Sequence, residues 1–160
     1  MDFQKRLEKA IERGQRLGGA RAQAEAKKAV TEKEFARLHS LYRLELSEYI
    51  EGCLRQLADH FPGFRFETVV GEAGWGAAIS RDDIKVRPGR RTNYFSRLEM
   101  AVRPPSSYNV LDLTAKATIR NKELFNRSHY QRLTEVDPTS FTELIDLWVL
   151  EYAELYAAKQ

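Results

Sequence analysis

The residues best suited to acid–base or metal chemistry are few and lie far apart in this sequence. The three histidines are His39, His60 and His129, and the single cysteine is Cys53. No two of them stand at the i, i+4 spacing with which a helix presents a pair of metal ligands, and the chain contains no HExxH, CxxC, GxSxG or Walker sequence. We therefore expect no metal site, no nucleophilic site and no cofactor.

One combination of charged residues is compatible with nuclease chemistry. Glu67 precedes the segment Asp83-Ile84-Lys85, and some nucleases use an acid followed by acid-x-Lys to hold a divalent metal and to orient the attacking water. The pattern is short, and a chain with 31% charged residues produces such triplets by chance. A metal-dependent nuclease is therefore a remote alternative, and a hairpin turn explains Asp82-Asp83 equally well.

Basic residues in the middle of the chain favour another alternative, a nucleic-acid-binding domain. Residues 61–135 carry 13 basic and 8 acidic side chains, whereas residues 136–160 carry one and five. This excess of positive charge could contact phosphate, but it could equally attract the acidic C-terminal segment within one fold. The candidate anion contacts lie on predicted strands and on one predicted basic loop; they are Arg87, Arg90, Arg91, Arg97, Lys116 and Arg120.

A long helix predicted over residues 31–61 is the first element that would position these side chains. Its apolar residues recur at spacings of three and four, which is the period of an amphipathic helix. Thr31 and Glu34 predict a capping box at its start, and Pro62-Gly63 predicts its end. Gly52 lies inside the pattern, and its low helix propensity leaves open whether the helix is continuous.

An amphipathic helix is also predicted over residues 2–17, and Gly18-Gly19 is expected to end it or to act as a hinge. Its apolar stripe consists of Phe3, Leu7, Ile11 and Leu17, together with small residues. We therefore expect residues 1–30 to form an N-terminal helical arm beside a single domain over residues 31–160. The stripe could dock on a partner, pack on its own domain or, least favourably, lie on an anionic membrane surface.

The pattern changes to a period of two after Phe64, which is typical of half-buried strands. Strands are predicted over residues 64–70, 93–103, 108–120 and 123–136, with short strand-like pieces over residues 75–80 and 84–86. Asp137-Pro138 then predicts the start of a C-terminal helix that is apolar nearly all round and is expected to be the most buried helix. The predicted fold class is α+β, with an antiparallel sheet of four to five strands packed with a long N-terminal helix and a C-terminal helix, plus the N-terminal arm.

Surplus apolar helix surface favours one function above the others. The long helix has a wide apolar sector, and the arm adds a second stripe, so we predict a non-enzymatic protein-interaction or assembly module with a detachable arm. The predicted partner-binding residues are Phe3, Leu7, Ile11, Leu17, Leu41 and Leu44. The spacing of these residues leaves open the identity of the partner, the oligomeric state and the role of the open sheet face.

The location of the protein follows from what the sequence lacks. No run approaches the 18 or so apolar residues of a membrane helix, and the first residues mix acids with bases without an apolar signal core. The single cysteine cannot form an internal disulfide. We therefore expect a cytoplasmic protein without a membrane span or a disulfide.

Overall fold

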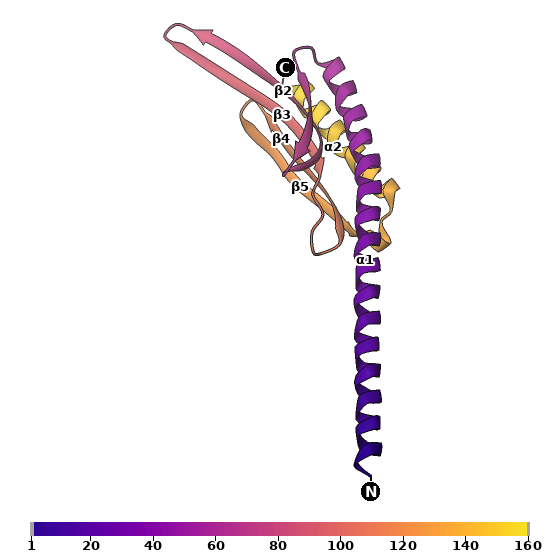
Figure 1. Ribbon diagram of the computed structural model, residues 1–160. Coiled ribbons are helices and arrows are strands. Elements are labelled where there is room, and N and C mark those ends of the chain that lie inside the picture. The colour runs from indigo at the N-terminus through magenta and orange to yellow at the C-terminus, as the bar shows by residue number, and fades with distance from the viewer. Residues whose placement is uncertain (1, 160) are drawn as a thin grey trace. The chain divides into compact units, whose positions relative to one another are not determined.

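The computed structural model describes residues 2–159, which form two α-helices, a five-stranded sheet and one short 3-10 helix. In chain order the elements are α1 (Phe3–His60), β1 (Arg65–Gly71), β2 (Gly74–Arg87), β3 (Arg90–Val102), β4 (Val110–Ile119), β5 (Lys122–Arg132), η1 (Leu133–Glu135) and α2 (Pro138–Ala158). The predicted α+β class is thereby confirmed (Figure 1). By its internal contacts the chain divides into two units, one up to Arg37 and one from Leu38 onward.

Helix α1 begins much earlier than predicted, and the capping box at Thr31 is wrong. The helix runs without a break from Phe3 to His60, and the Thr31 hydroxyl donates to the carbonyl oxygen of Lys27 at 2.9 Å, as a residue inside a helix does. Glu34 pairs with the side chain of Arg37 instead of capping a helix start. The sequence around Thr31 is rich in strong helix formers, so a cap-like pair is not enough to begin a new helix there.

The predicted break at Gly18-Gly19 is wrong for the same reason. Each glycine costs about 1 kcal/mol relative to alanine inside a helix, but alanine, lysine, arginine and glutamate around it favour the helical state. Both glycines are helical, and so is Gly52, which settles the continuity of the long helix. The helix ends as predicted, because Pro62 cannot continue it and Gly63 takes a left-handed φ of 103°.

The sheet is an antiparallel meander in which each strand pairs with the next one in the chain. The predicted strands over 75–80 and 84–86 are parts of the single strand β2, and the last predicted strand ends at Arg132, where η1 follows. Strand β4 confirms the predicted alternation, since one set of its side chains is buried. These residues are Leu111, Leu113, Ala115, Ala117 and Ile119.

The core lies between the sheet and a layer formed by residues 38–60 of α1 and by α2, which cover the same face of the sheet (Figure 1). The Tyr152 hydroxyl reaches from α2 to the carbonyl oxygen of Thr118 at 3.0 Å. The N-terminus of α2 is capped as predicted, because the Asp137 carboxylate accepts from the backbone N–H of Thr139. The largest fully buried side chains include Leu46, Ile50, Leu54, Ile79, Leu98, Met100, Phe141 and Ile145.

His39 is the one buried histidine of the described residues and connects α1 to the end of β3. Its side chain is 2% exposed, its Nε2 donates to the carbonyl oxygen of Arg103 at 3.0 Å, and its ring meets Trp75 edge to face. Burial lowers the pKa of His39 below its usual range, although the hydrogen bond to Arg103 partly opposes this. The imidazole is therefore neutral in the folded protein near pH 7.

The free energy of unfolding is expected to fall as the pH drops from 7 to 5. Because the pKa of His39 is lower in the folded state, the unfolded state binds more protons below about pH 6.5, and the stabilisation is lost as pH falls through the folded pKa. Urea unfolding of the wild type and of His39→Gln at both pH values measures this. The drop should shrink in His39→Gln and persist in His60→Gln, whose histidine is exposed.

Candidate interaction surfaces

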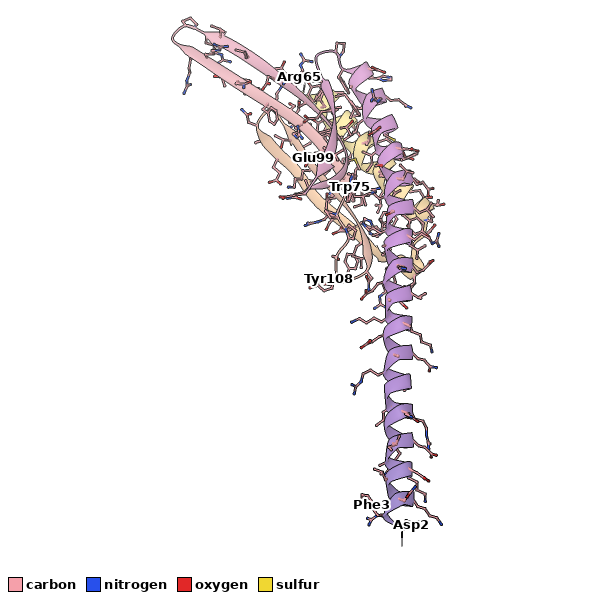
Figure 2. All side chains as sticks on the ribbon, viewed as in Figure 1. Asp2, Phe3, Arg65, Trp75, Glu99 and Tyr108 are labelled. Atoms are coloured by element: carbon pink, nitrogen blue, oxygen red, sulfur yellow. The ribbon has the colours of Figure 1, made fainter. Side chains whose placement is uncertain are left out.

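The N-terminal part of α1 exposes its four predicted partner-binding residues. Phe3 is 75% exposed and Leu17 69%, whereas Leu7 and Ile11 are 47% and 52% exposed. Phe3 stands at the very start of the helix (Figure 2). An exposed apolar stripe of this kind marks an interaction surface more often than isolated apolar residues do.

The same part of the helix is basic. Residues 2–37 carry ten basic and six acidic side chains. Ion pairs within this part are few and exposed, such as Arg16 with Glu12 at 3.8 Å, and pairs of this kind contribute little stability. An amphipathic helix with a basic surface is therefore available for an acidic partner.

The second unit has an apolar groove between α1 and α2, which is the kind of surface on which an apolar helix stripe can dock. It has a volume of about 420 Å³. Leu150 lines it and is 65% exposed, and Leu147 on the same helix is 61% exposed. The prediction that α2 is the most buried helix is confirmed, since six of its 21 residues are buried and only five of the 58 residues of α1 are, but its outward side is exposed. The lining residues are Cys53, Gln56, Leu57, His60, Phe61, Asp146, Val149, Leu150 and Ala153.

The two helix segments beside this groove carry more acidic than basic side chains. Residues 38–60 and 138–158 together contain eight acidic side chains and two arginines. The guanidinium carbon of Arg43 lies 4.3 Å from the centre of the Trp75 ring, and that of Arg55 lies 4.0 Å from the centre of the Phe66 ring. Both arginines therefore stack on rings of the sheet. Seven acidic residues of the two helices form no ion pair within residues 2–159: Glu45, Glu48, Glu51, Asp59, Glu143, Asp146 and Glu154.

Cys53 lies in the groove but is not arranged as a nucleophile. Its Sγ lies 3.8 Å from Oδ1 of Asp146, and the Tyr49 hydroxyl donates to the same oxygen at 2.6 Å. Burial and the nearby Asp146 carboxylate raise the pKa of the Cys53 thiol, so the thiol stays protonated. These contacts join α1 to α2.

Leu41 and Leu44, the other predicted partner-binding residues, are 52% and 55% exposed on α1.

The open face of the sheet is less basic than its sequence indicates. Arg97 is held between two carboxylates, with Glu67 at 2.5 Å and Glu99 at 3.1 Å. Lys116 stands opposite Glu99 in the register of β3 and β4. Arg127 of β5 lies on the other face, opposite the buried Ala115, and pairs with Glu151 of α2. Acidic neighbours thus compensate much of the positive charge on the strands.

Arg87, Arg90 and Arg91 lie apart from Arg97 and Lys116, at the tip of the β2–β3 hairpin. The predicted basic loop is shorter than expected, because only Pro88 and Gly89 connect the two strands, with Gly89 at a φ of 75°. Arg120 lies in the turn between β4 and β5 with a φ of 48°. The structure therefore divides the predicted anion contacts into Arg97 and Lys116 on the sheet, of which Arg97 is paired with acids, Arg120 in the turn between β4 and β5, and the three arginines at the hairpin tip.

The predicted nuclease residues do not come together. Glu67 lies opposite Ala78 in the register of β1 and β2, so its side chain points to the face opposite to that of Asp83, which is an odd number of residues further along β2. Asp83 pairs with Arg81 at 2.9 Å, and Lys85 lies over the ring of Tyr94. Within residues 2–159 no three His, Cys, Asp or Glu side chains gather where they could hold a metal ion.

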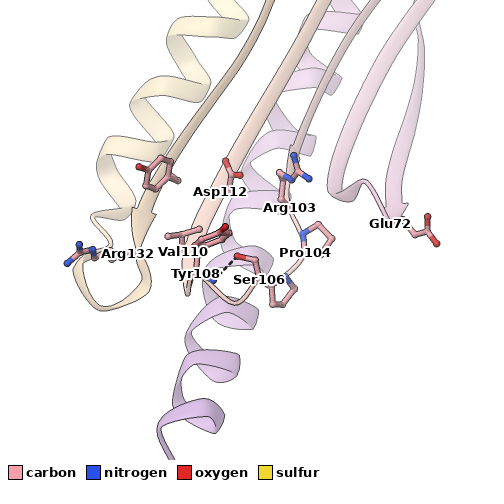
Figure 3. Close-up of a pocket in the computed structure, with 10 residues that line it drawn as sticks. Glu72, Arg103, Pro104, Ser106, Tyr108, Val110, Asp112 and Arg132 are labelled. Atoms are coloured by element: carbon pink, nitrogen blue, oxygen red, sulfur yellow. Dashed lines mark hydrogen bonds between the residues drawn. The ribbon is translucent and has the colours of Figure 1, made fainter. Parts of the chain in front are cut away.

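A hollow of about 700 Å³ lies beside the end of β3, the start of β4 and the end of β5 (Figure 3). Two exposed tyrosines, Tyr108 and Tyr130, line it together with Arg103, Arg132 and Asp112. Oδ1 of Asp112 is buried and has no hydrogen-bond partner among the described residues. Burial raises the pKa of Asp112, and the positive charge of Arg103 partly opposes the shift. No spacing in the sequence predicts this hollow, because its residues come from separate segments.

No family model matches the chain, and no curated protein or solved structure matches it either. Neither described helix combines the length and the apolar character that a membrane crossing requires. The surfaces described above are therefore the basis on which a function can be inferred.

Proposed function

We propose that the protein is a non-enzymatic assembly module that associates with a second copy of itself through its N-terminal helix. The helical arm, here the part of α1 up to Arg37, docks on the groove between α1 and α2 of the partner. The observation that carries the proposal is the exposure of the arm's apolar stripe, from Phe3 to Leu17. A long helix without burial of its apolar side chains gains most of its stability from a partner.

The groove supports this choice of partner by its shape and by its composition. Amphipathic helices bind in apolar grooves through anchor residues spaced by three and four along the helix. Leu7 and Ile11 have this spacing, and the groove presents Leu150 and Val149 as apolar contacts. The arm therefore offers anchors of the size and spacing that a groove between two helices accepts.

Charge complementarity supports a second copy over an unrelated protein. The arm carries ten bases and six acids, and the helical layer beside the groove carries eight acids and two arginines. Both arginines stack on aromatic rings of the sheet. The bases of the docked arm would therefore face carboxylates that surround the apolar groove. Two copies can exchange arms symmetrically, which closes the assembly as a dimer.

The molar mass of the intact chain in solution tests the proposal. Light scattering during size-exclusion chromatography is expected to give twice the 18.5 kDa of one chain at micromolar concentration. A mass of one chain at every concentration up to about 100 µM, where even weak specific dimers assemble, would rule out self-association. In that case the arm would need a different protein partner.

A further inference from the structure

The β2–β3 hairpin continues beyond the rest of the sheet as a two-stranded ribbon. β1 pairs with β2 only as far as Ser80, and β4 pairs with β3 only from Arg97 onward. Residues 82–87 and 90–95 therefore pair in six register positions with each other and with no other strand (Figure 1). At about 3.3 Å per residue this ribbon is roughly 20 Å long.

Four basic side chains occupy the ribbon, and none of them forms an ion pair within residues 2–159. They are Lys85, Arg87, Arg90 and Arg91. The two acids of the ribbon are already engaged at its base, where Asp82 contacts Arg65 at 3.3 Å and Asp83 contacts Arg81 at 2.9 Å. The uncompensated charge of the ribbon is therefore positive and concentrated at the tip.

The turn between β4 and β5 is attached to the base of the ribbon and adds further bases. Asn121 donates its backbone N–H to the carbonyl oxygen of Phe95, accepts the N–H of Phe95 at its Oδ1, and donates from Nδ2 to the carbonyl oxygen of Asn93, each at 2.8 Å. These bonds hold Arg120 and Lys122 beside the ribbon. The Arg120 N–H also donates to the hydroxyl of Ser96 at 3.0 Å, which fixes the turn.

From this arrangement we infer that the ribbon binds duplex DNA. The major groove of B-form DNA is about 12 Å wide and 8.5 Å deep and admits a two-stranded ribbon, whereas the major groove of duplex RNA is too narrow for side chains to enter. The arginines at the tip, together with Arg120 and Lys122 at the base, would contact phosphates on both sides of the groove. The open sheet face contributes little, because Arg97 is held between Glu67 and Glu99.

Binding of this kind is expected to be strong at low salt and to weaken steeply as salt is added. Each phosphate contact contributes about 0.9 to the slope of the logarithm of the binding constant against the logarithm of salt concentration. Ile84 and Val86 are exposed on the ribbon and would contact thymine methyl groups in the groove. The phosphate contacts would still supply most of the affinity.

Fluorescence anisotropy with a labelled DNA duplex of about two helical turns, at several salt concentrations, tests the inference. The variant Arg87→Gln/Arg90→Gln/Arg91→Gln should bind at least about tenfold more weakly at low salt, and its salt slope should be smaller by about three. The matched control, Lys116→Gln/Arg132→Gln/Lys159→Gln, removes three exposed positive charges that lie outside both the arm and the ribbon, and it should bind within about twofold of the wild type. Circular dichroism and melting of all three proteins verify that they are folded.

Two results would overturn the inference. Equal loss of affinity in the ribbon variant and in the control would show that only the net charge matters. Binding of an RNA duplex of the same length as tightly as the DNA duplex would exclude entry into the major groove. Because the ribbon variant keeps the arm and the groove, its molar mass should equal that of the wild type, so the outcome is separate from that of self-association.

Discussion

Replacing Leu7 and Ile11 with glutamine is expected to convert the proposed dimer into a monomer at micromolar concentration. Both side chains are about half exposed in the arm, so docking would bury the rest of each, which contributes about 1 kcal/mol per side chain. A symmetric dimer contains each contact twice. The total loss of about 4 kcal/mol corresponds to a dissociation constant about 1,000-fold weaker. Analytical ultracentrifugation over a concentration series measures it.

Glutamine keeps the charge of the arm unchanged, so the variant isolates the apolar contribution. The control is Val30→Gln, which replaces an apolar side chain that is 67% exposed on the same helix but lies outside the stripe of Phe3, Leu7, Ile11 and Leu17. Its dissociation constant should stay within about threefold of the wild type. Equal weakening by both changes would mean that general hydrophobicity of the arm drives association, and that the groove has no specific role.

Gly76→Ala is expected to lower the free energy of unfolding by about 2–3 kcal/mol. A Cβ at this position would lie 1.9 Å from the carbonyl oxygen of Met100 on the neighbouring strand, which is far inside van der Waals contact. Backbone atoms of β2 and β3 must therefore move apart, and such overpacking typically costs about 1–3 kcal/mol. Urea unfolding monitored by tryptophan fluorescence measures the change, because Trp75 is adjacent.

Gly52→Ala is the matched control for that substitution. A Cβ added to Gly52 in α1 would meet no atom within 4 Å, and alanine is favoured over glycine inside a helix by about 1 kcal/mol. This variant should be as stable as the wild type or more stable by up to that amount. A destabilised Gly52→Ala together with a neutral Gly76→Ala would contradict the close approach of β2 and β3.

The class of fold could be predicted because the two hydrophobic periods are clear. The alternation of Leu111 to Ile119 and the helical spacing after Pro138 each determine one buried side, and both are confirmed. The glycines at 71, 74 and 76 indicate a tight turn in the sequence, and Gly71 and Gly74 do flank one. Gly76 serves a different purpose, since its strand passes too close to Met100 for a side chain.

The start of α1 could not be predicted, because local signals compete with propensity over a long segment. Thr31, Glu34 and Gly18-Gly19 all indicate an end or a start, but each is worth about 1 kcal/mol, and many strong helix formers outweigh them together. The exposed side of α2 could not be predicted for a related reason, although α2 is the most buried helix, as expected. Leu147 and Leu150 make its sequence apolar all round, and only the tertiary structure shows that they face outward.

The candidate surfaces depend on contacts that sequence spacing does not contain. Arg97 pairs with a carboxylate of another strand, and Arg43 and Arg55 stack on rings of the sheet. Only the fold shows that these three charges are engaged and add little to a basic surface. The ribbon exists because β2 and β3 extend beyond the ends of β1 and β4. Predicting it would require knowing how these four strands are paired. The arm's apolar stripe, in contrast, is readable from the spacing of Leu7 and Ile11 with their neighbours.

Arm exchange is tested most directly by mixing two variants, each of which is expected to be monomeric on its own. Leu7→Gln/Ile11→Gln has a defective arm and an intact groove, and Leu150→Gln has an intact arm and a defective groove. A mixture should form a heterodimer of twice the mass of one chain, because one arm and one groove remain functional together. A mixture that stays monomeric while the wild type dimerises would contradict docking of the arm in the groove between α1 and α2.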